Sequence, residues 1–281
     1  MLNRYDAVLA ALHAGVVIHG PDSAILEAND RARNLLGLQD LEGRLATDPD
    51  WVFLEADHSP MALEHFPVVQ VITTRRPLRG MIGILRPPSG ADVWLEINAL
   101  PVLGDAGQLD QVVVTFIDVT DRIAAEQNLL HIATHDDLTG LPNRAALLAE
   151  ISRRMAESNQ PARVAFVDLD RFRVINESLG HRGGDDLLVQ VATRLTERLG
   201  PREMLGRLGG DEFVVVLGDE PPEASVERLL SAFDEPFQVD DAVTAFTASI
   251  GVAYAAAETG LVEAEDLLDR ADTAMFAAKH D

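Results

Sequence analysis

The 281-residue sequence contains no cysteine, only two tryptophans and two tyrosines, and half as many basic as acidic residues. Without cysteine, the chain can form no disulfide, no thiolate metal site and no cysteine nucleophile. The formal net charge of -23 makes the surface repel phosphate backbones, so we expect no general binding to nucleic acid. A nucleotide substrate stays compatible with this charge, because a few carboxylates can hold a metal ion that offsets the field.

Long apolar runs are also missing. No run approaches the roughly 20 residues that a membrane helix needs, and residues 1–6 lack an apolar signal core. We therefore expect the covered segment to be soluble and to have no membrane partner. Apolar residues nevertheless make up 47% of the chain, which is enough for two cores, and the length favours two domains.

The first half of the chain alternates apolar strands with turns. Asn29 and Asp30 offer a cap to a short helix that ends near Gly37, and a second helix is expected around residues 66–74. Gly-Pro-Asp-Ser, Pro-Pro-Ser-Gly and Gly-Asp-Ala-Gly sequences mark the turns. The pattern predicts strands at residues 15–19, 24–28, 78–85, 93–103 and 109–118.

Two short motifs give this half a resemblance to a known family. Glu27-Ala28-Asn29 follows the first strand pair, and the half closes on Phe116-Ile117-Asp118-Val119-Thr120-Asp121-Arg122. In this order the motifs resemble a PAS sensor domain, which we assign to residues 1–121. The resemblance implies an antiparallel sheet with flanking helices.

The sequence does not identify a ligand for this sensor. PAS folds enclose haem, flavin, a small acid or nothing, and the absence of cysteine excludes a flavin–cysteinyl adduct. His58 and His65 are candidate haem ligands, although a surface or structural role is favoured for both. Trp51 and Trp94 are expected to be packing residues.

Residues 122–135 have a helical pattern and are predicted to be a signalling linker helix. Ile123 and Leu130 lie seven residues apart, with Ala133 three further on, so a partner helix could pack there. A plain linker is one interpretation; a dimeric coiled-coil stub is favoured. We therefore expect a homodimer that forms through the sensor and this helix.

The second half, residues 136–281, alternates strands and helices and indicates an α/β or α+β sheet covered on one side. Gly180 is expected to stop a helix that starts at Phe172, and Asp185-Asp186 to cap the next one. The pattern predicts strands at residues 163–168, 204–208, 213–217 and 245–254, and helices at 172–179, from 185 onward and at 264–279.

Acidic residues stand at two places in this half where strands end. Asp168 ends an apolar strand, and Asp211 and Glu212 follow the Gly209-Gly210 turn. A carboxylate at the mouth of a buried strand is costly unless it is paired, solvated or metal-bound. These acids could converge on Mg²⁺, whereas Asp170 is expected to cap the following helix.

Five blocks of this half resemble the GGDEF domain of diguanylate cyclases. They begin at Asp136-Asp137-Leu138-Thr139 and end with Ala271-Asp272 through Ala278-Lys279, and the resemblance covers residues 136–281. Between them lie residues 168–176, residues 180–185 and Gly209-Gly210-Asp211-Glu212-Phe213. The family's fold is a central antiparallel sheet surrounded by helices, similar to polymerase palm domains, so the whole chain is predicted to be α+β.

The resemblance implies the site residues. Two Mg²⁺ ions, with Mn²⁺ as an alternative, would be held by Asp168, the Leu169 carbonyl, Asp211 and Glu212. Asp211 and Glu212 would be catalytic, with Asp211 helping to deprotonate a ribose 3′-hydroxyl.

The remaining expected contacts are with GTP. Asn176 and Asp185 match the pair that reads the guanine edge, a task that suits an amide beside a carboxylate. Arg173 stands where the family usually has lysine, and an arginine keeps the charge for the terminal phosphates. The other expected substrate-binding residues are Phe172, Gly209, Gly210 and Lys279.

The sequence departs from the family pattern at two places. Gly200 and Glu203 replace the Arg and Asp of the usual product-inhibition site, so we expect no inhibitory site there. The chain also stops just after Lys279, where relatives continue with a further segment, and this suggests a truncated C-terminal end.

These observations predict a PAS-regulated transferase that condenses two GTP molecules into cyclic di-GMP and two pyrophosphates. The resemblances favour a cytoplasmic protein of signal transduction. The alternative is a catalytically weak GTP-binding GGDEF module of a larger protein that also carries an EAL phosphodiesterase domain.

Overall fold

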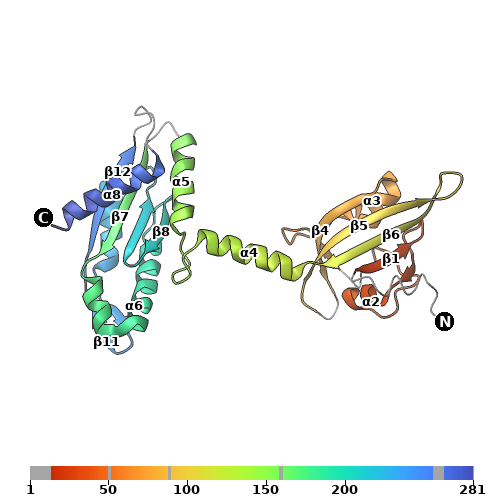
Figure 1. The fold of residues 1–281 in the computed structure, drawn as a ribbon, viewed down its shortest axis with the longest axis horizontal. Helices are drawn as coiled ribbons and strands as arrows, with labels where there is room; N and C mark the ends of the chain where they lie inside the picture. The colour runs from red at the N-terminus through yellow and green to blue at the C-terminus, as the bar shows by residue number, and fades with distance from the viewer. Residues whose placement is uncertain (1–13, 50–51, 88–89, 158–160, 256–262, 281) are drawn as a thin grey trace. The chain divides into compact units, whose positions relative to one another are not determined.

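The computed structural model describes residues 14–49, 52–87, 90–157, 161–255 and 263–280. The chain divides into two compact units, residues 1–127 and residues 128–281 (Figure 1). Among the described residues, no helix is both long enough and apolar enough to cross a bilayer.

The first unit is a six-stranded antiparallel sheet of order β2-β1-β6-β5-β4-β3. Helix α2 packs on β1, and helix α3 packs on β4, β5 and β6, so the helices cover the core side of the sheet. The PAS-like antiparallel sheet is thus confirmed, while the short strand β3 was not predicted. The elements are β1 (Gly15–His19), β2 (Ile25–Ala28), α2 (Asp30–Leu36), β3 (Val52–Leu54), η1 (Leu63–His65), α3 (Pro67–Thr74), β4 (Leu78–Arg86), β5 (Val93–Leu103) and β6 (Leu109–Asp118).

Asn29 caps helix α2, as the sequence predicts. Its side-chain oxygen accepts hydrogen bonds from the backbone N–H groups of Ala32 and Val16, both at 2.9 Å. The helix ends at Gly37, which has a left-handed backbone conformation. One side chain therefore joins the helix start to strand β1.

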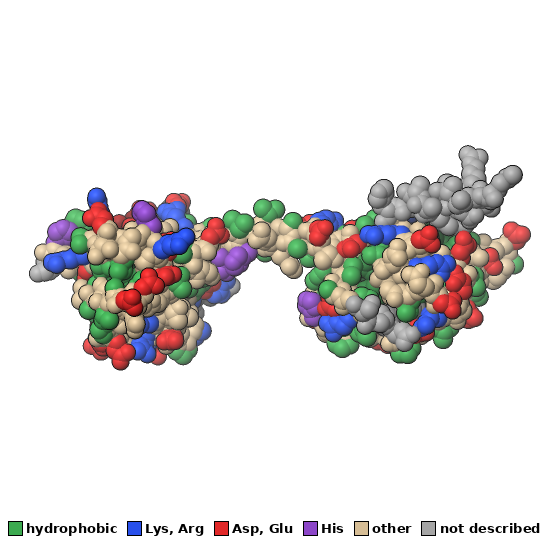
Figure 2. Space-filling view, turned by 90° about the horizontal axis from the view of Figure 1, so that it is seen from below, with side chains coloured by type: hydrophobic (Ala, Val, Ile, Leu, Met, Phe, Trp, Pro, Cys, Tyr) green, Lys and Arg blue, Asp and Glu red, His purple; other side chains and the backbone are tan. Residues whose placement is uncertain are grey.

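Helix α4 (Thr120–Thr134) covers the predicted linker apart from its last residue, His135, and the division between the two units falls within the helix. It buries none of its side chains. Three large apolar side chains, Leu129, Leu130 and Ile132, are 67%, 66% and 49% exposed, and apolar side chains are visible on the narrow helix in Figure 2. This exposed apolar surface is compatible with a partner helix.

The second unit is built on a four-stranded antiparallel sheet of order β12-β7-β9-β8. Four consecutive residues of β7, Val164 to Val167, are buried, so both faces of the sheet are covered. Helices α5 and α8 pack on one face, and α6 packs in the core on the other. The elements are α5 (Arg144–Glu157), β7 (Ala162–Leu169), α6 (Phe172–Glu197), β8 (Met204–Gly209), β9 (Glu212–Val216), α7 (Pro222–Leu230), η2 (Ser231–Phe233), β10 (Phe237–Val239), β11 (Ala242–Thr244), β12 (Ala248–Ala255) and α8 (Ala264–Ala278).

Three local predictions for this unit were wrong. The strand and helix pattern alone indicated a sheet covered on one side, whereas both sides are covered, as the family resemblance implied. Asp170 does not cap α6; its carboxylate accepts hydrogen bonds from Thr247 and Ser249, and Arg171 stands at the N-cap. Gly180 does interrupt α6, but the residues after it are already helical, so Asp185 lies within the helix instead of capping it.

Candidate active site

Asp168 and Glu212 lie directly opposite each other on neighbouring strands. Asp168 is the next-to-last residue of β7 and pairs in register with Glu212, the first residue of β9. The adjoining Asp211 accepts a hydrogen bond from the Leu169 N–H through its backbone carbonyl, at 3.4 Å. Strand pairing therefore brings together the acids that the sequence predicted to converge.

The turn before these acids depends on its two glycines. Gly209 and Gly210 have φ values of 141° and 53°, conformations that other residues rarely adopt. A Cβ atom at either position would meet nothing within 4 Å, so backbone conformation, not crowding, requires glycine. The open space leaves the turn accessible to a ligand.

Arg207 holds this turn in place, a role that the sequence reasoning missed. Its buried guanidinium donates hydrogen bonds to the Gly210 carbonyl and also pairs with Asp136. Asp136 stands in the first family block, whereas Arg207 lies two residues before the Gly209–Phe213 block, and nothing in the sequence indicated that the two residues pair.

The carboxylates of the site act on one another electrostatically. Partial burial, with the negative charge of Asp168, raises the pKa of Asp211. Partial burial and then the charges of Asp211, Asp272 and Asp168 raise the pKa of Glu212. Asp272, on α8, is one of the charges that raise the pKa of Glu212, and it was not among the predicted site residues. A cation between these groups would relieve this repulsion.

Lys279 is one cation that already contacts the site. Its ammonium forms an ion pair with the Asp168 carboxylate. Partial burial alone would lower the pKa of Lys279, but the bond to Asp168 and the charges of Asp170 and Asp211 outweigh it and raise the pKa. The residue at the end of α8 is thereby brought to the acidic edge of the sheet.

The donor atoms at this edge suit a hard divalent cation. Carboxylate oxygens and a strand-end carbonyl are the ligand types that Mg²⁺ prefers, and it normally adds water and substrate phosphates. Within the described ranges, no group of three or more His, Asp or Glu residues is preassembled as a metal site. The carboxylate oxygens match the ligands that Mg²⁺ prefers, and phosphate oxygens of a substrate would have to complete the coordination of the ion.

Asn176 lies on α6 with a buried oxygen that has no hydrogen-bond partner. The side chain packs against Gly184, where a Cβ atom would overlap the Asn176 amide. Asp185, the next residue, is exposed. An orphaned buried acceptor is costly, so this position is suited to a ligand that supplies a donor.

Phe172 and Arg173, two further predicted substrate contacts, differ in how exposed their side chains are. The Phe172 side chain belongs to the core, so only its backbone is available to a substrate. Arg173 is 90% exposed and pairs with Glu177, one helical turn further on, at 3.0 Å. Its guanidinium is therefore free to reorient toward a ligand at modest cost.

The side chain of Glu203 has no exposed surface, and its partners are internal. Its carboxylate accepts hydrogen bonds from Ser225 at 2.7 Å and from the Gly200 N–H at 2.6 Å, and it pairs with Arg228 at 2.8 Å. A Cβ atom on Gly200 would crowd the Arg228 guanidinium. This arrangement supports the prediction that the positions do not form a product-inhibition site.

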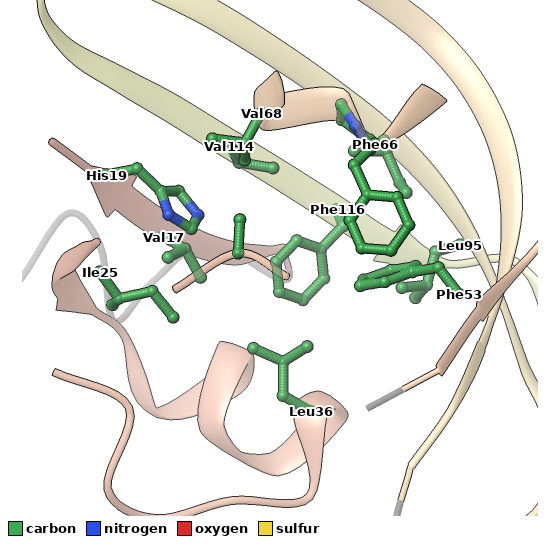
Figure 3. A pocket seen from close by; sticks show the side chains of 13 residues that line it. Val17, His19, Ile25, Leu36, Phe53, Phe66, Val68, Leu95, Val114 and Phe116 are labelled. Atoms are coloured by element: carbon green, nitrogen blue, oxygen red, sulfur yellow. The ribbon is translucent and has the colours of Figure 1, made fainter. Parts of the chain in front are cut away.

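The candidate haem ligands of the first unit lie at its surface. His65 is 57% exposed and pairs with Glu55, whereas His58 is 59% exposed and packs edge-on against Trp94. Neither lines the small apolar pocket of this unit, which is bounded by residues such as Val17, Phe53 and Phe116 (Figure 3). Trp94 is half-buried and has a packing contact, as expected, while Trp51 lies outside the described residues.

Comparison with known proteins identifies both units. The diguanylate cyclase GGDEF domain family matches residues 133–281, and the PAS fold family matches residues 9–124. Diguanylate cyclase TpbB of Pseudomonas aeruginosa is 38% identical over 226 residues, which cover 73% of this chain and 52% of TpbB. Uncharacterized protein Rv1354c of Mycobacterium tuberculosis is 38% identical over 209 residues, which cover 72% of this chain and 31% of that protein.

A solved structure shares the fold of the second unit. The coiled coil and GGDEF domain of DgcB from Caulobacter crescentus, in complex with c-di-GMP, matches 57% of this chain and 88% of that one, with 25% identity and a TM-score of 0.51. The chain spans less than a third of the length of the first curated relatives it matches. The match of the second unit covers more than half of the chain, so the protein belongs to the GGDEF diguanylate cyclase domain family, with a PAS domain before the GGDEF domain.

Proposed function

We propose that the chain is a diguanylate cyclase that condenses two GTP molecules into cyclic di-GMP and two pyrophosphates. The observation that carries this proposal is the register pairing of Asp168 with Glu212, beside Asp211 and the glycine turn. Because GTP is a cytoplasmic nucleotide, we assign the reaction to the cytoplasm.

Asp168, the Leu169 carbonyl, Asp211 and Glu212 would hold two divalent ions, Mg²⁺ or Mn²⁺. Bound there, the ions would neutralise charge on the phosphates of GTP and so favour attack at the α-phosphorus. Partial burial, and then the charges of neighbouring carboxylates, raise the pKa values of Asp211 and Glu212, and a bound cation would stabilise the ionised form of both groups.

Asp211 is the proposed base. A 3′-hydroxyl of a second GTP loses its proton to the Asp211 carboxylate, and the 3′-oxygen forms a bond to the α-phosphorus. The bond from this phosphorus to the bridging oxygen breaks, and pyrophosphate leaves.

The other side chains bind GTP. Gly209 and Gly210 let the backbone approach the phosphates, and Lys279 and Arg173 contact the terminal ones. Asn176 and Asp185 read the guanine, whose ring N–H and amino groups are donors for acceptor oxygens. The unpartnered Asn176 oxygen supports this assignment.

One such site holds only one of the two reacting nucleotides. A second copy of the chain must supply the other GTP, with the two α-phosphates and 3′-hydroxyls facing each other. We propose that the PAS units and α4 form this homodimer, and that the exposed leucines of α4 take part. Signals in the PAS unit would then change turnover by altering how the two catalytic units meet.

The test is incubation with GTP and Mg²⁺, followed by chromatography of the nucleotides. The wild-type chain should form cyclic di-GMP, and Asp211→Asn should reduce the rate at least about a hundredfold, as expected when a base is removed. Asp137→Asn is the matched control, because Asp137 is an exposed acid outside the site. Recovery of all GTP unconverted would refute the cyclase.

A GTP-binding module without turnover is the second candidate. The ion pair between Lys279 and Asp168 favours it, because the ammonium occupies a proposed metal ligand. Equilibrium dialysis separates the two: bound but unconverted GTP supports the module. Faster turnover by Lys279→Met would mean that the lysine only competes with the metal, whereas slower turnover supports phosphate contact.

A further inference from the structure

Two histidine side chains lie against each other at the end of helix α4. His131 is on the last turn of the helix, and His135 directly follows its last residue, Thr134. The ring centroids are 4.3 Å apart and the ring planes differ by 18°, so the two imidazoles are stacked. Both belong to the second unit; His131 is exposed and His135 is half-buried. The pair is therefore accessible from solvent, and it shares no residue with the acidic site.

The backbone fixes the spacing of the two rings. The N–H of His135 donates a hydrogen bond to the His131 carbonyl oxygen at 2.7 Å, so the helical bonding pattern extends to His135. The N–H of Asn143 donates to the Thr134 carbonyl oxygen at 2.9 Å and fastens the helix end to the following segment. Side chains four residues apart project from one face of a helix. Two histidines at this spacing are an arrangement with which helices chelate zinc.

Thr134 sets the position of the proton on the His135 ring. Its hydroxyl donates to the Leu130 carbonyl oxygen at 2.7 Å and so uses its only proton. The Nδ1 atom of His135 lies 2.9 Å from the same hydroxyl oxygen, so Nδ1–H is the donor in this contact and Nε2 keeps a free lone pair. A histidine whose other ring N–H is held in this way is the usual form of a metal ligand.

His131 supplies the second nitrogen. Among the described residues, none forms a hydrogen bond with its ring, so the exposed imidazole can turn about its side-chain bonds. Because the stacked rings are nearly parallel, their lone pairs converge on one ion only after such a turn. The partial negative charge at the end of a helix and the net charge of -23 both favour a cation at this place.

We propose that His131 and His135 bind one divalent ion of the class that imidazole prefers, such as Zn²⁺, with water completing its coordination. Within the described ranges no third His, Asp or Glu joins the pair, so the site is open. Mg²⁺ prefers oxygen ligands, so the ion at this site is distinct from the metal proposed for the acidic edge. The proposal does not depend on the cyclase reaction.

Calorimetric titration of Zn²⁺ into the full chain tests the site. The titration is done at pH 7 with an excess of Mg²⁺, which competes for the acidic edge but not for imidazole. His131→Gln should weaken Zn²⁺ binding at least about tenfold, because the second ligand of the chelate is lost. His181→Gln, at a single exposed histidine on α6, should leave the affinity unchanged.

A spacing variant is the matched control for composition. His131→Ala combined with Ala133→His keeps two histidines but places them two residues apart, where side chains on a helix do not face each other. This variant should lose as much affinity as His131→Gln. An affinity equal to that of the wild-type chain would overturn the proposal.

The wild-type chain provides a test without substitution. The ¹⁵N resonances of the His131 and His135 rings should shift together when Zn²⁺ is added, and neither should shift with Mg²⁺ alone. Zn²⁺ binding that leaves these two rings unchanged would place the ion elsewhere and contradict the assignment.

Discussion

Arg207 and Asp136 form an ion pair that joins two segments far apart in the sequence. The Nη1 atom of Arg207 lies 2.7 Å from Asp136 Oδ1, while its Nε and Nη2 atoms lie 3.1 and 2.8 Å from the Gly210 carbonyl oxygen. Burial alone would raise the pKa of Asp136, but hydrogen bonds from Thr139 and Arg207 outweigh it and lower the pKa. The segment before α5 is thus fastened to the turn that carries Asp211.

Replacing Arg207 by methionine should therefore damage both stability and turnover. Asp136 would lose its buried cation, and the Gly210 carbonyl would lose two donors. We expect the free energy of unfolding to fall by about 3 kcal/mol in urea denaturation, as for other broken buried pairs. Cyclic di-GMP formation should fall as well, because the turn is no longer held.

A double-variant cycle separates the pair from its surroundings. Asp136→Asn combined with Arg207→Met should lose less stability than the sum of the two single changes. Strictly additive losses would mean that the ion pair does not couple the two segments.

Asp211→Asn should make the metal-free chain more stable at neutral pH. The pKa of Asp211 is raised in the folded state, so its ionisation costs folding free energy above that raised pKa. We expect a gain of about 0.5–1 kcal/mol in thermal or urea unfolding with EDTA at pH 7, after allowing for solvent screening. The Asp211 carboxylate would then serve function while lowering the free energy of unfolding.

The same comparison has a defined pH dependence. The gain should shrink as the pH falls through the raised folded pKa, and it should vanish below the ordinary value of 3.8. Asp137→Asn, at an exposed position, should show no such gain. A variant that is less stable than wild type at pH 7 would contradict the repulsion inferred for the acidic edge.

Glu203 should act in folding and not in product binding. Its carboxylate faces Ser225 and Arg228 with no exposed surface. Glu203→Gln should lower the free energy of unfolding by about 2–3 kcal/mol, because Arg228 loses a buried partner. Added cyclic di-GMP should not slow the wild-type chain through this position, and a saturable complex whose affinity depends on Glu203 would show otherwise.

Fixing two α4 helices together should change turnover. Leu130 is 66% exposed, and the chain has no cysteine, so Leu130→Cys offers one defined cross-link between two copies. Initial rates of cyclic di-GMP formation are compared for the oxidised and reduced protein, with uncross-linkable Leu130→Ser as control. A rate that is the same in both redox states would remove the proposed role of the helix as a lever.

Much of this arrangement could be predicted from the sequence because local signals agree with the fold. Strand β1 begins and ends where apolar residues and the Gly-Pro turn place it, and Gly180 interrupts α6 as expected. The family blocks selected Asp168 and Glu212 as candidate site residues, and the pairing of β7 with β9 brings these two acids opposite each other.

The unpredicted features depend on contacts between distant residues. Asp170 was expected to cap a helix, but the hydroxyls of Thr247 and Ser249, on or just before β12, offer it better donors. Both faces of the second sheet are covered because α5 and α8 pack opposite α6, and helix α5 was not among the helices predicted from the sequence. The stacking of His131 on His135 was not predicted either, because the linker was interpreted from its apolar residues alone.

The most direct test of the central claim is to count the divalent ions held by the acids. Mn²⁺ binding is followed by electron paramagnetic resonance in the presence of GTP, for the wild-type chain and for Glu212→Gln. The account predicts two bound ions per wild-type chain and the loss of at least one in the variant. Equal numbers of ions in both proteins would contradict the claim that Glu212, beside Asp168 and Asp211, forms the metal site.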